Sequence, residues 1–267
     1  MEGKLIFLGS GASMGVPVIG CQCAVCRSDS PYNKRMRPSV LIKVEQKQFV
    51  IDVGPDFRAQ ALRQGISHIN GILFTHAHQD HTAGIDDLRP LFYRQASPIP
   101  ILASEETAKD IKARFHFIFK SNAENPTFVP RLKESLLPSK QGKVVFEGIE
   151  VGYSTFVQGG MGVNGYRIGD MAYLTDIKHY DEGIFEWLKG VKTLIVSALR
   201  ISTSPLHLSV PDAVVFADKV AAQKVWLTHT SHDLEYEKTN ASLPAHVQLA
   251  YDGLEVEFNL ENYEDRF

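Results

Sequence analysis

The stretch Thr75-His76-Ala77-His78-Gln79-Asp80-His81 places three imidazoles and one carboxylate, all able to bind a metal ion, within six residues. It directly follows an apolar, strand-like segment at residues 71–74. On a helix His76 and His78 would point about 200° apart, whereas in an extended or looped backbone they point the same way and can chelate one ion. Asp80 and His81 are adjacent, so their side chains point in different directions from each other. They are therefore better placed to hold a second ion beside the first. The alternative is a solvated polar loop without a metal. So dense a cluster of possible ligands makes this alternative less favourable.

The composition is that of an ordinary globular chain. Of the 267 residues, 44% are hydrophobic and 22% are charged, and we expect a single domain over residues 1–267. No apolar run approaches the ~20 residues that span a bilayer, and the N-terminus leads into a short strand, so we expect a cytoplasmic protein without membrane contact. The net charge of −3 offers no general electrostatic support for nucleic-acid binding.

All three cysteines, Cys21, Cys23 and Cys26, fall within six residues. An odd and tightly clustered set is not typical of a secreted disulfide framework. The spacing Cys-x-Cys-x-x-Cys predicts three thiolate ligands of a structural zinc, which needs a fourth ligand from elsewhere. His232 is a candidate for that fourth ligand. The alternatives are three unrelated reduced thiols and an exposed histidine without a ligand role.

Strand-like and helix-like segments alternate along two similar halves of the chain. This pattern predicts an α+β fold in which two sheets pack face to face with helices outside, a four-layer αββα sandwich. The predicted strands are residues 4–8, a hairpin of 40–44 with 48–51, 69–74, 99–102, 144–156, 166–169, 171–174, 193–197, 224–227, and a final hairpin of 247–251 with 254–258. The predicted helices are residues 57–63, 85–94, 104–119, 180–188 and 210–220, and residues 121–141 are expected to be a loop-rich insertion.

Two further residues repeat the arrangement that precedes His76, in which an apolar strand is followed by threonine and then by a residue able to bind metal. Asp176 follows Thr175, and His229 follows Thr228. A helix cap is the alternative for Asp176, but three occurrences of one arrangement favour a shared metal site. Asp52 also ends a predicted strand, and we expect it to orient a ligand histidine from behind.

These segments together resemble the metallo-β-lactamase superfamily, and within it the branch of PhnP-like phosphodiesterases and ribonuclease Z-like hydrolases. The similar segments cover nearly the whole chain, from 9–13 and 20–26 through 51–56, 75–81, 84–89 and 173–176 to 227–229 and 251–254. The resemblance implies the αββα fold with a site of two divalent ions, Zn or Mn. It implies His76 and His78 on one ion, with Asp80, His81 and His229 on the other and Asp176 bridging.

The same resemblance assigns roles to residues outside the two-ion site. It implies one structural zinc held by Cys21, Cys23, Cys26 and His232. It makes His207 a phosphate contact or proton donor, although by itself this residue could equally be part of a surface loop.

The chain departs from the family pattern at one ligand of the first ion. The third histidine of that ion is replaced by Gln158, ahead of the strand that contains Tyr166. An amide is a poorer zinc ligand than imidazole. The sequence therefore predicts a complete site for the second ion, whereas the first ion is expected to bind weakly, to be a harder ion or to be absent.

The expected function is metal-dependent hydrolysis of a small or cyclic phosphodiester by water activated on the ions, with Asp80 and His207 as catalytic residues. The first alternative is an RNA 3′-processing endonuclease, although nucleic acid is not the favoured partner. The second is a non-catalytic binding or scaffold protein with a degraded first metal site. A homodimer is expected only from the resemblance.

Overall fold

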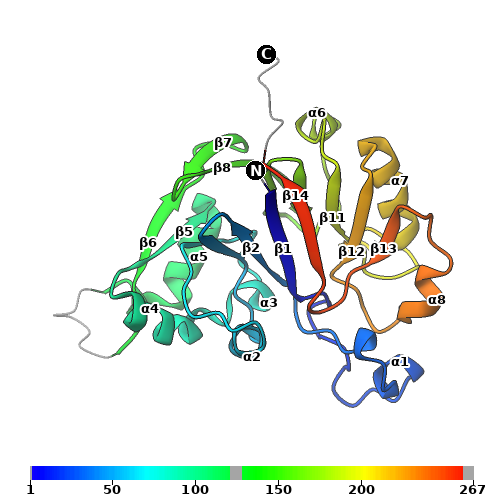
Figure 1. Ribbon diagram of the computed structural model, residues 1–267, viewed down its shortest axis with the longest axis horizontal. Helices are drawn as coiled ribbons and strands as arrows, with labels where there is room; N and C mark the ends of the chain where they lie inside the picture. Colours follow the sequence, from blue (N-terminus) through cyan, green and yellow to red (C-terminus); the bar gives the residue numbers. More distant parts are fainter. Residues whose placement is uncertain (1, 121–127, 261–267) are drawn as a thin grey trace.

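The computed structural model describes residues 2–120 and 128–260, and within them two seven-stranded sheets pack face to face (Figure 1). The first sheet contains, in spatial order, β14 (Glu255–Asn259), β1 (Glu2–Gly9), β2 (Ser39–Val44), β3 (Lys47–Ile51), β4 (Gly71–Leu73), β5 (Ile99–Ala103) and β6 (Leu132–Leu136). The second contains β13 (Val247–Leu249), β12 (Lys224–Thr228), β11 (Thr193–Ser197), β10 (Met171–Leu174), β9 (Met161–Ile168), β8 (Ile149–Gln158) and β7 (Gln141–Phe146).

Helices cover the outer face of each sheet. Those that follow strands of the first half are α2 (Phe57–Arg63), α3 (Gln79–Thr82), η2 (Ile85–Leu88), α4 (Arg89–Gln95), α5 (Glu105–Arg114) and η3 (His116–Ile118). Those of the second half are α6 (Ile184–Trp187), α7 (Val210–Val220) and α8 (Tyr236–Asn240). Two short turns, α1 (Ala24–Arg27) and η1 (Pro31–Asn33), lie in the long connection between β1 and β2. No helix in the described ranges is both long enough and apolar enough to span a bilayer.

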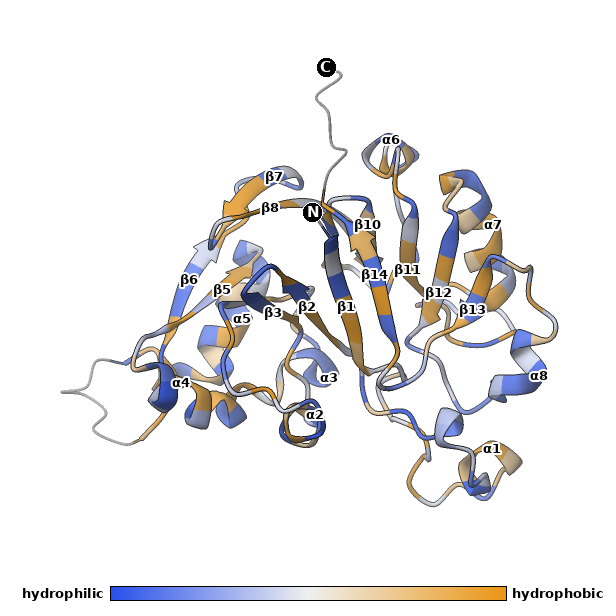
Figure 2. Cartoon of the chain, in the orientation of Figure 1, coloured by the Kyte–Doolittle hydropathy of each residue, from blue (hydrophilic) through white to orange (hydrophobic). Residues whose placement is uncertain are grey.

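The alternation of side chains along β1 explains why the molecule has more than one apolar layer. Leu5 and Phe7 point into the core between the sheets, where Tyr166 of the opposite sheet is also buried. Ile6 and Leu8 point the other way, into the layer beneath the helices. Figure 2 shows hydrophobic residues along much of β7, β12 and the lower part of β1, and both hydrophobic and hydrophilic residues on helices such as α7. The predicted αββα sandwich is confirmed.

Several local predictions need correction. The segments 247–251 and 254–258 do not form a hairpin, because β13 pairs with β12 whereas β14 crosses to the first sheet and pairs with β1. Asp252 stabilises the crossing, since its carboxylate accepts hydrogen bonds from the backbone N–H groups of Ser10 (2.9 Å) and Met36 (2.8 Å). A pattern of alternating residues does not reveal which sheet a strand joins.

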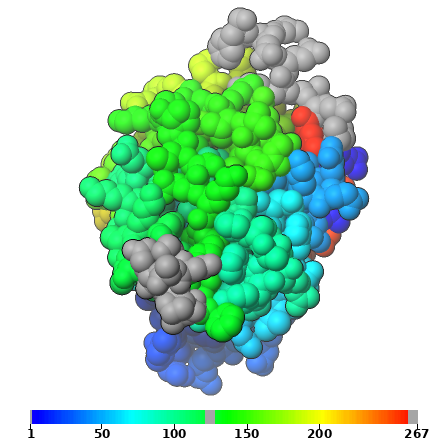
Figure 3. Space-filling model, turned by 90° about the vertical axis from the view of Figure 1, so that its left-hand side faces the viewer, coloured from blue at the N-terminus to red at the C-terminus, as the bar shows by residue number. Residues whose placement is uncertain are grey.

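The predicted strand 144–156 is in fact the hairpin of β7 and β8, which turns at Glu147 and Gly148. Both residues have a positive φ, as a two-residue turn of type I′ requires. Residues 121–127 of the predicted insertion lie outside the described residues, and its remainder contains β6. Figure 3 shows this side of the molecule, where the green residues of the β7–β8 hairpin lie against the blue-green residues of the helices. The predicted helix 180–188 is shorter and begins only at Ile184.

Candidate metal centre

The ends of parallel strands bring the predicted ligands to one edge of the sandwich. In the second sheet β10, β11 and β12 are parallel, so Asp176 after β10 and His229 after β12 emerge on the same side. In the first sheet β3 and β4 are parallel, so Asp52 and the residues after Leu73 also meet there. Residues that follow parallel strands lie at the same edge, where open α/β sheets bind ligands.

Three of the site residues have an unusual backbone conformation. Asp52, Asp176 and His229 have φ values of 64°, 54° and 55°, in the left-handed region that residues other than glycine seldom adopt. Such backbone conformations cost on the order of 1–3 kcal/mol each and cluster at functional sites. The spacing of residues in the sequence does not reveal this conformation.

The predicted second-ion ligands converge in the interior. The ligand atoms of Asp80, His81 and His229 all lie within 4.8 Å of one another. Asp80 Oδ2 is 3.4 Å from His81 Nε2 and 3.5 Å from His229 Nε2. All three atoms are buried and have no hydrogen-bond partner among the described residues. Buried polar atoms are rarely left unpaired, so this donor set fits a divalent cation.

Asp176 lies between the two halves of the site. Its Oδ2 is 3.1 Å from His81 Nε2 and 3.4 Å from His229 Nε2, and it accepts a hydrogen bond from the Thr175 hydroxyl. Asp176 also forms a ligand group with His76 and His81. The carboxylate therefore has the central position that a bridging ligand needs.

The first-ion half is built differently. His76 Nε2 and His78 Nδ1 are 2.9 Å apart, so the two imidazoles converge as the spacing predicts. Gln158, the last residue of β8, is buried in the place predicted for the missing histidine. Its Nε2 donates a hydrogen bond to Asp176 Oδ1 (2.8 Å). An amide N–H group cannot coordinate a metal, so in this arrangement the first half has two imidazoles and no third nitrogen ligand.

Burial and neighbouring charges shift the pKa values of the site residues in opposite directions. Burial disfavours protonation of His81, but the carboxylates of Asp80, Asp52 and Asp176 outweigh it and raise the pKa of His81 well above its usual range. Burial also disfavours the ionised form of Asp176, yet His229 and His81 hold the pKa of this carboxyl well below its usual range. Three clustered carboxylates that favour a proton on His81 also favour a divalent cation.

Asp52 contacts His81 on the side away from the other ligands. Asp52 Oδ2 is 2.6 Å from His81 Nδ1, and the carboxylate accepts hydrogen bonds from the Thr75 backbone N–H (2.8 Å) and hydroxyl (2.7 Å). With a proton held on Nδ1 by Asp52, His81 could give up the proton on Nε2 to a cation and bind it through that nitrogen. Such an orienting contact is what the sequence predicts for Asp52.

Replacing Asp52 with asparagine is expected to lower metal affinity and hydrolysis by about 10–100-fold. If the amide oxygen accepts from the Thr75 N–H, the amide N–H₂ faces His81 Nδ1 and favours the tautomer with its proton on Nε2. Competition with a chelator measures the affinity of the site, and the exposed Asp87→Asn is the matched control. Unchanged affinity in Asp52→Asn would show that this contact does not set the tautomer.

His207 lies beside the predicted metal ligands, near the end of the loop that precedes α7. Its Nδ1 is 3.4 Å from Asp176 Oδ1, and its ring stacks on that of His229 at 4.9 Å. Burial, followed by the charge of His229, lowers the pKa of His207 to about 4. At neutral pH the imidazole is uncharged, which favours a phosphate contact by one N–H hydrogen bond over proton donation.

The cysteines and His232 form a second cluster. His232 Nδ1 is 3.3 Å from Cys21 Sγ and 3.5 Å from the Sγ atoms of both Cys23 and Cys26. Tetrahedral zinc with one nitrogen and three sulfur ligands would place nitrogen and sulfur about 3.6 Å apart. A hydrogen bond from the Cys26 backbone N–H lowers the pKa of Cys23 to about 6, which favours the thiolate. The four residues fit the predicted structural zinc.

One contact of the loop at residues 76–82 was not predicted from the sequence. Arg114, in the last turn of α5, donates hydrogen bonds to the Ala77 carbonyl (2.5 Å) and to the Thr82 hydroxyl (3.1 Å). It thereby connects the His76–His78 half of the loop to the half that carries Asp80. The sequence signal, one basic residue at a helix end, is too common to be informative.

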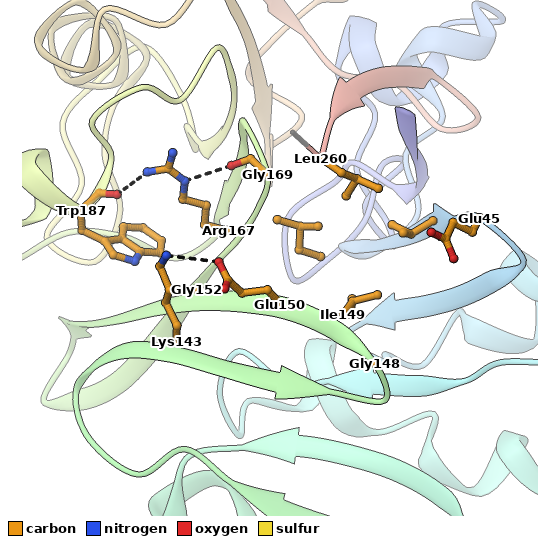
Figure 4. A pocket seen from close by; sticks show the side chains of 12 residues that line it. Glu45, Lys143, Gly148, Ile149, Glu150, Gly152, Arg167, Gly169, Trp187 and Leu260 are labelled. Carbon is orange, nitrogen blue, oxygen red and sulfur yellow. Dashed lines mark hydrogen bonds and ion pairs between the residues drawn. The ribbon is translucent and has the colours of Figure 1, made fainter. Parts of the chain in front are cut away.

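A separate cavity of about 200 Å³ lies away from these clusters (Figure 4). The basic side chains that line it form ion pairs or hydrogen bonds with other groups of the protein. Lys143 pairs with Glu150 at 3.2 Å, and Arg167 donates to the carbonyls of Trp187 (2.7 Å) and Gly169 (3.1 Å). None of the predicted ligands lines this cavity, so we assign it no part in the metal chemistry.

Comparisons with known proteins agree with this geometry. A family model described as the beta-lactamase superfamily domain matches residues 47–230. The chain is 34% identical over 257 residues to a Porphyromonas gingivalis protein named octanoyltransferase, covering 94% of this chain but only 51% of that protein. The chain thus spans about half the length of this relative.

Solved structures extend the comparison. A crystal structure of a diphosphatase from the PhnP family has a TM-score of 0.88 and 39% identity, with 97% of this chain and 98% of that one covered. Zn²⁺-bound PqqB from Methylobacterium extorquens, with a TM-score of 0.71 and 17% identity, covers 95% of this chain and 99% of that one and shares the fold. The chain therefore belongs to the metallo-β-lactamase superfamily of metal-dependent hydrolases, in its PhnP-like branch.

Proposed function

We propose that the protein is a phosphodiesterase that acts on a small or cyclic phosphodiester within one hydrolase domain, residues 1–267. The convergence of buried, unpaired ligand atoms from Asp80, His81 and His229 around Asp176 carries this proposal. His207 beside that centre supports a phosphoryl substrate, since its neutral imidazole can donate to a phosphoryl oxygen. The similarity to a PhnP-family diphosphatase over almost the whole chain supports the same class of reaction.

The proposed cofactors are two divalent ions, Zn or Mn, in the active site and one structural Zn. Asp80, His81, His229 and Asp176 would hold one catalytic ion, and His76, His78 and Asp176 would hold the other more weakly. Such ions lower the pKa of a bound water to ~7 and neutralise charge on phosphoryl oxygens.

The protein side chains have separate tasks in this reaction. Asp52 keeps the proton of His81 on Nδ1. Arg114 holds the loop that carries His76 and His78. His207 donates a hydrogen bond to the phosphoryl group. Gln158 donates one N–H to Asp176 and so orients that carboxylate. The name of the P. gingivalis relative does not extend acyl transfer to this chain, because the match covers only half of that protein.

Removal of metal with EDTA is expected to abolish hydrolysis of bis-p-nitrophenyl phosphate, and addition of Zn²⁺ or Mn²⁺ should restore it. Release of p-nitrophenol measures the rate, and p-nitrophenyl octanoate is the parallel substrate that reports carbonyl chemistry. Circular dichroism of the treated protein separates loss of the catalytic ions from unfolding at the cysteine cluster. Undiminished phosphodiesterase activity in metal-free protein, or turnover of the octanoyl ester alone, would contradict the proposal.

A further inference from the structure

We propose that Arg35 is a positioning residue that couples the cysteine cluster to the metal centre, so that zinc at the cysteines strengthens binding of the second ion. The inference rests on the metal sites proposed above and adds that the two depend on each other. It arises from residues 229–232, because His229 is a predicted ligand of the second ion and His232 is a predicted ligand of the structural zinc. A change that displaces one end of so short a segment is expected to displace the other.

The connection between β1 and β2 carries both the cysteines and Arg35. Figure 1 shows this connection, with α1, at the lower edge of the molecule and outside the two sheets. Arg35 follows Cys26 by nine residues, and its backbone pairs with that of Val16 through two hydrogen bonds of 2.8 Å. Zinc that draws the cysteines together therefore orders the same connection from which the Arg35 side chain extends.

The Arg35 side chain joins this connection to the segment after β12. It is buried, with 2% of the residue exposed. It makes five hydrogen bonds, as many as a guanidinium has N–H groups, and all five acceptors are uncharged oxygens. Two acceptors lie in the same connection, the Tyr32 carbonyl (3.0 Å) and Asn33 Oδ1 (3.0 Å). The other three lie after β12 and are Thr230 Oγ1 (3.2 Å), the Ser231 carbonyl (3.1 Å) and the Leu234 carbonyl (2.7 Å).

The charge of Arg35 makes this set of contacts rigid. Burial lowers the pKa of Arg35 to about 10, so the guanidinium is still charged at neutral pH. Hydrogen bonds from a charged donor are stronger than those between neutral groups, and a buried charge without them is costly. The connection and the segment after β12 are therefore held in one relative position.

Thr230 transmits this position to the metal centre, because it directly follows His229. Its N–H donates to the Ser10 carbonyl (3.1 Å), and its hydroxyl accepts from Arg35 and lies 3.3 Å from the same carbonyl. His229 has a φ of 55°, a conformation that persists only where the surrounding contacts hold it. A segment already ordered by zinc loses less conformational entropy when an ion binds at His229, which gives positive coupling between the sites.

Titration with Mn²⁺ tests the coupling in the unmodified protein. Mn²⁺ prefers oxygen and imidazole ligands to thiolates, so loss of the electron paramagnetic resonance signal of free Mn²⁺ reports binding at the metal centre. One Zn²⁺ per chain is added to metal-free protein, and protection of the thiols from Ellman's reagent verifies that it occupies the cysteines. The zinc-loaded protein should bind Mn²⁺ at least about fivefold more tightly than the zinc-free protein. Equal affinities in two samples that circular dichroism shows to be folded would overturn the coupling.

Substitutions assign the coupling to Arg35. In Arg35→Met zinc should still protect the thiols, but its effect on Mn²⁺ affinity should fall below about twofold, and Arg35→Lys should retain part of the effect. The exposed Arg58→Met is the matched control and should keep the full effect. A folded Arg35→Met protein with the full effect would overturn the role of Arg35. If this variant does not fold, Thr230→Val removes one acceptor of Arg35 without changing the shape of the residue, and the full effect in that variant would overturn the role.

Linkage provides a readout that a merely structural residue would not change. If zinc strengthens Mn²⁺ binding, then Mn²⁺ must strengthen zinc binding by the same factor. Equilibrium competition with a chelating dye that prefers Zn²⁺ should show tighter zinc binding at the cysteines with Mn²⁺ present, in Arg58→Met but not in Arg35→Met. Zinc affinity that does not respond to Mn²⁺ would overturn the coupling, also where the zinc-free chain does not fold. Coupled binding without hydrolysis of bis-p-nitrophenyl phosphate would contradict the proposed function and leave the coupling in place, whereas hydrolysis with uncoupled binding would do the reverse.

Discussion

Replacing Asp176 with alanine is expected to lower phosphodiester hydrolysis by at least about 10³-fold, a loss of roughly 4 kcal/mol of transition-state stabilisation. Asp176 is buried and central, with one carboxylate oxygen near both His81 and His229 and the other bonded to Gln158. Its removal takes a ligand from both halves of the centre and leaves Gln158 Nε2 without its acceptor. Steady-state rates with bis-p-nitrophenyl phosphate, together with metal content from elemental analysis, measure both losses.

The exposed Asp181→Ala, five residues further along the same loop, is the matched control and should keep the activity of the unmodified protein. Thermal unfolding should be followed for both variants, because a variant that fails to fold would also lose activity. A folded Asp176→Ala protein with most of its activity and metal would show that this carboxylate does not hold an ion.

Replacing Gln158 with histidine is expected to raise the affinity of the first-ion site by at least about tenfold, since changes around metal ligands are worth about 10–100-fold. The imidazole would replace an amide whose N–H₂ faces Asp176 with a nitrogen that can coordinate alongside His76 and His78. Elemental analysis should find more metal per chain than in the unmodified protein, and the rate at limiting metal concentration should increase.

Gln158→Ala is the control that separates the loss of the amide from the gain of an imidazole ligand. It removes the amide N–H₂ from Asp176 without supplying a ligand, so it should leave the metal content near that of the unmodified protein. If Gln158→Ala and Gln158→His bind the same amount of metal, the imidazole is not a ligand. If Gln158→His gains no metal at all, the first-ion half is limited by something other than its third ligand.

Much of the candidate site could be predicted from local sequence. The residues at 76–81 lie in a single loop, and their spacing alone indicates that they can share ions. The strand-threonine-ligand arrangement found Asp176 and His229 because parallel strands end at one edge. The cysteine spacing identified three members of the second cluster, and only the fold brings His232 to them.

Other parts of the site depend on contacts between residues far apart in the sequence. Arg114, for example, reaches the loop that carries His76 and His78 from a different helix. A lone arginine has the same local pattern whether it faces solvent or a ligand. The final strands were assigned to the wrong arrangement for the same reason, because hydrophobic alternation indicates a strand without indicating its neighbour.

The sequence by itself determined the superfamily, the two-sheet architecture and most residues of the candidate metal site, because those follow from local spacing and from the periodicity of apolar residues. Only the tertiary structure decided how the ligands are shared. It placed Asp176 between the two halves, as the family resemblance implies, and it turned the Gln158 amide N–H toward this carboxylate. It also left Asp80, His81 and His229 with unpaired buried atoms. The physical reason is that coordination and hydrogen bonding depend on distances of a few ångströms between strands that only folding brings together.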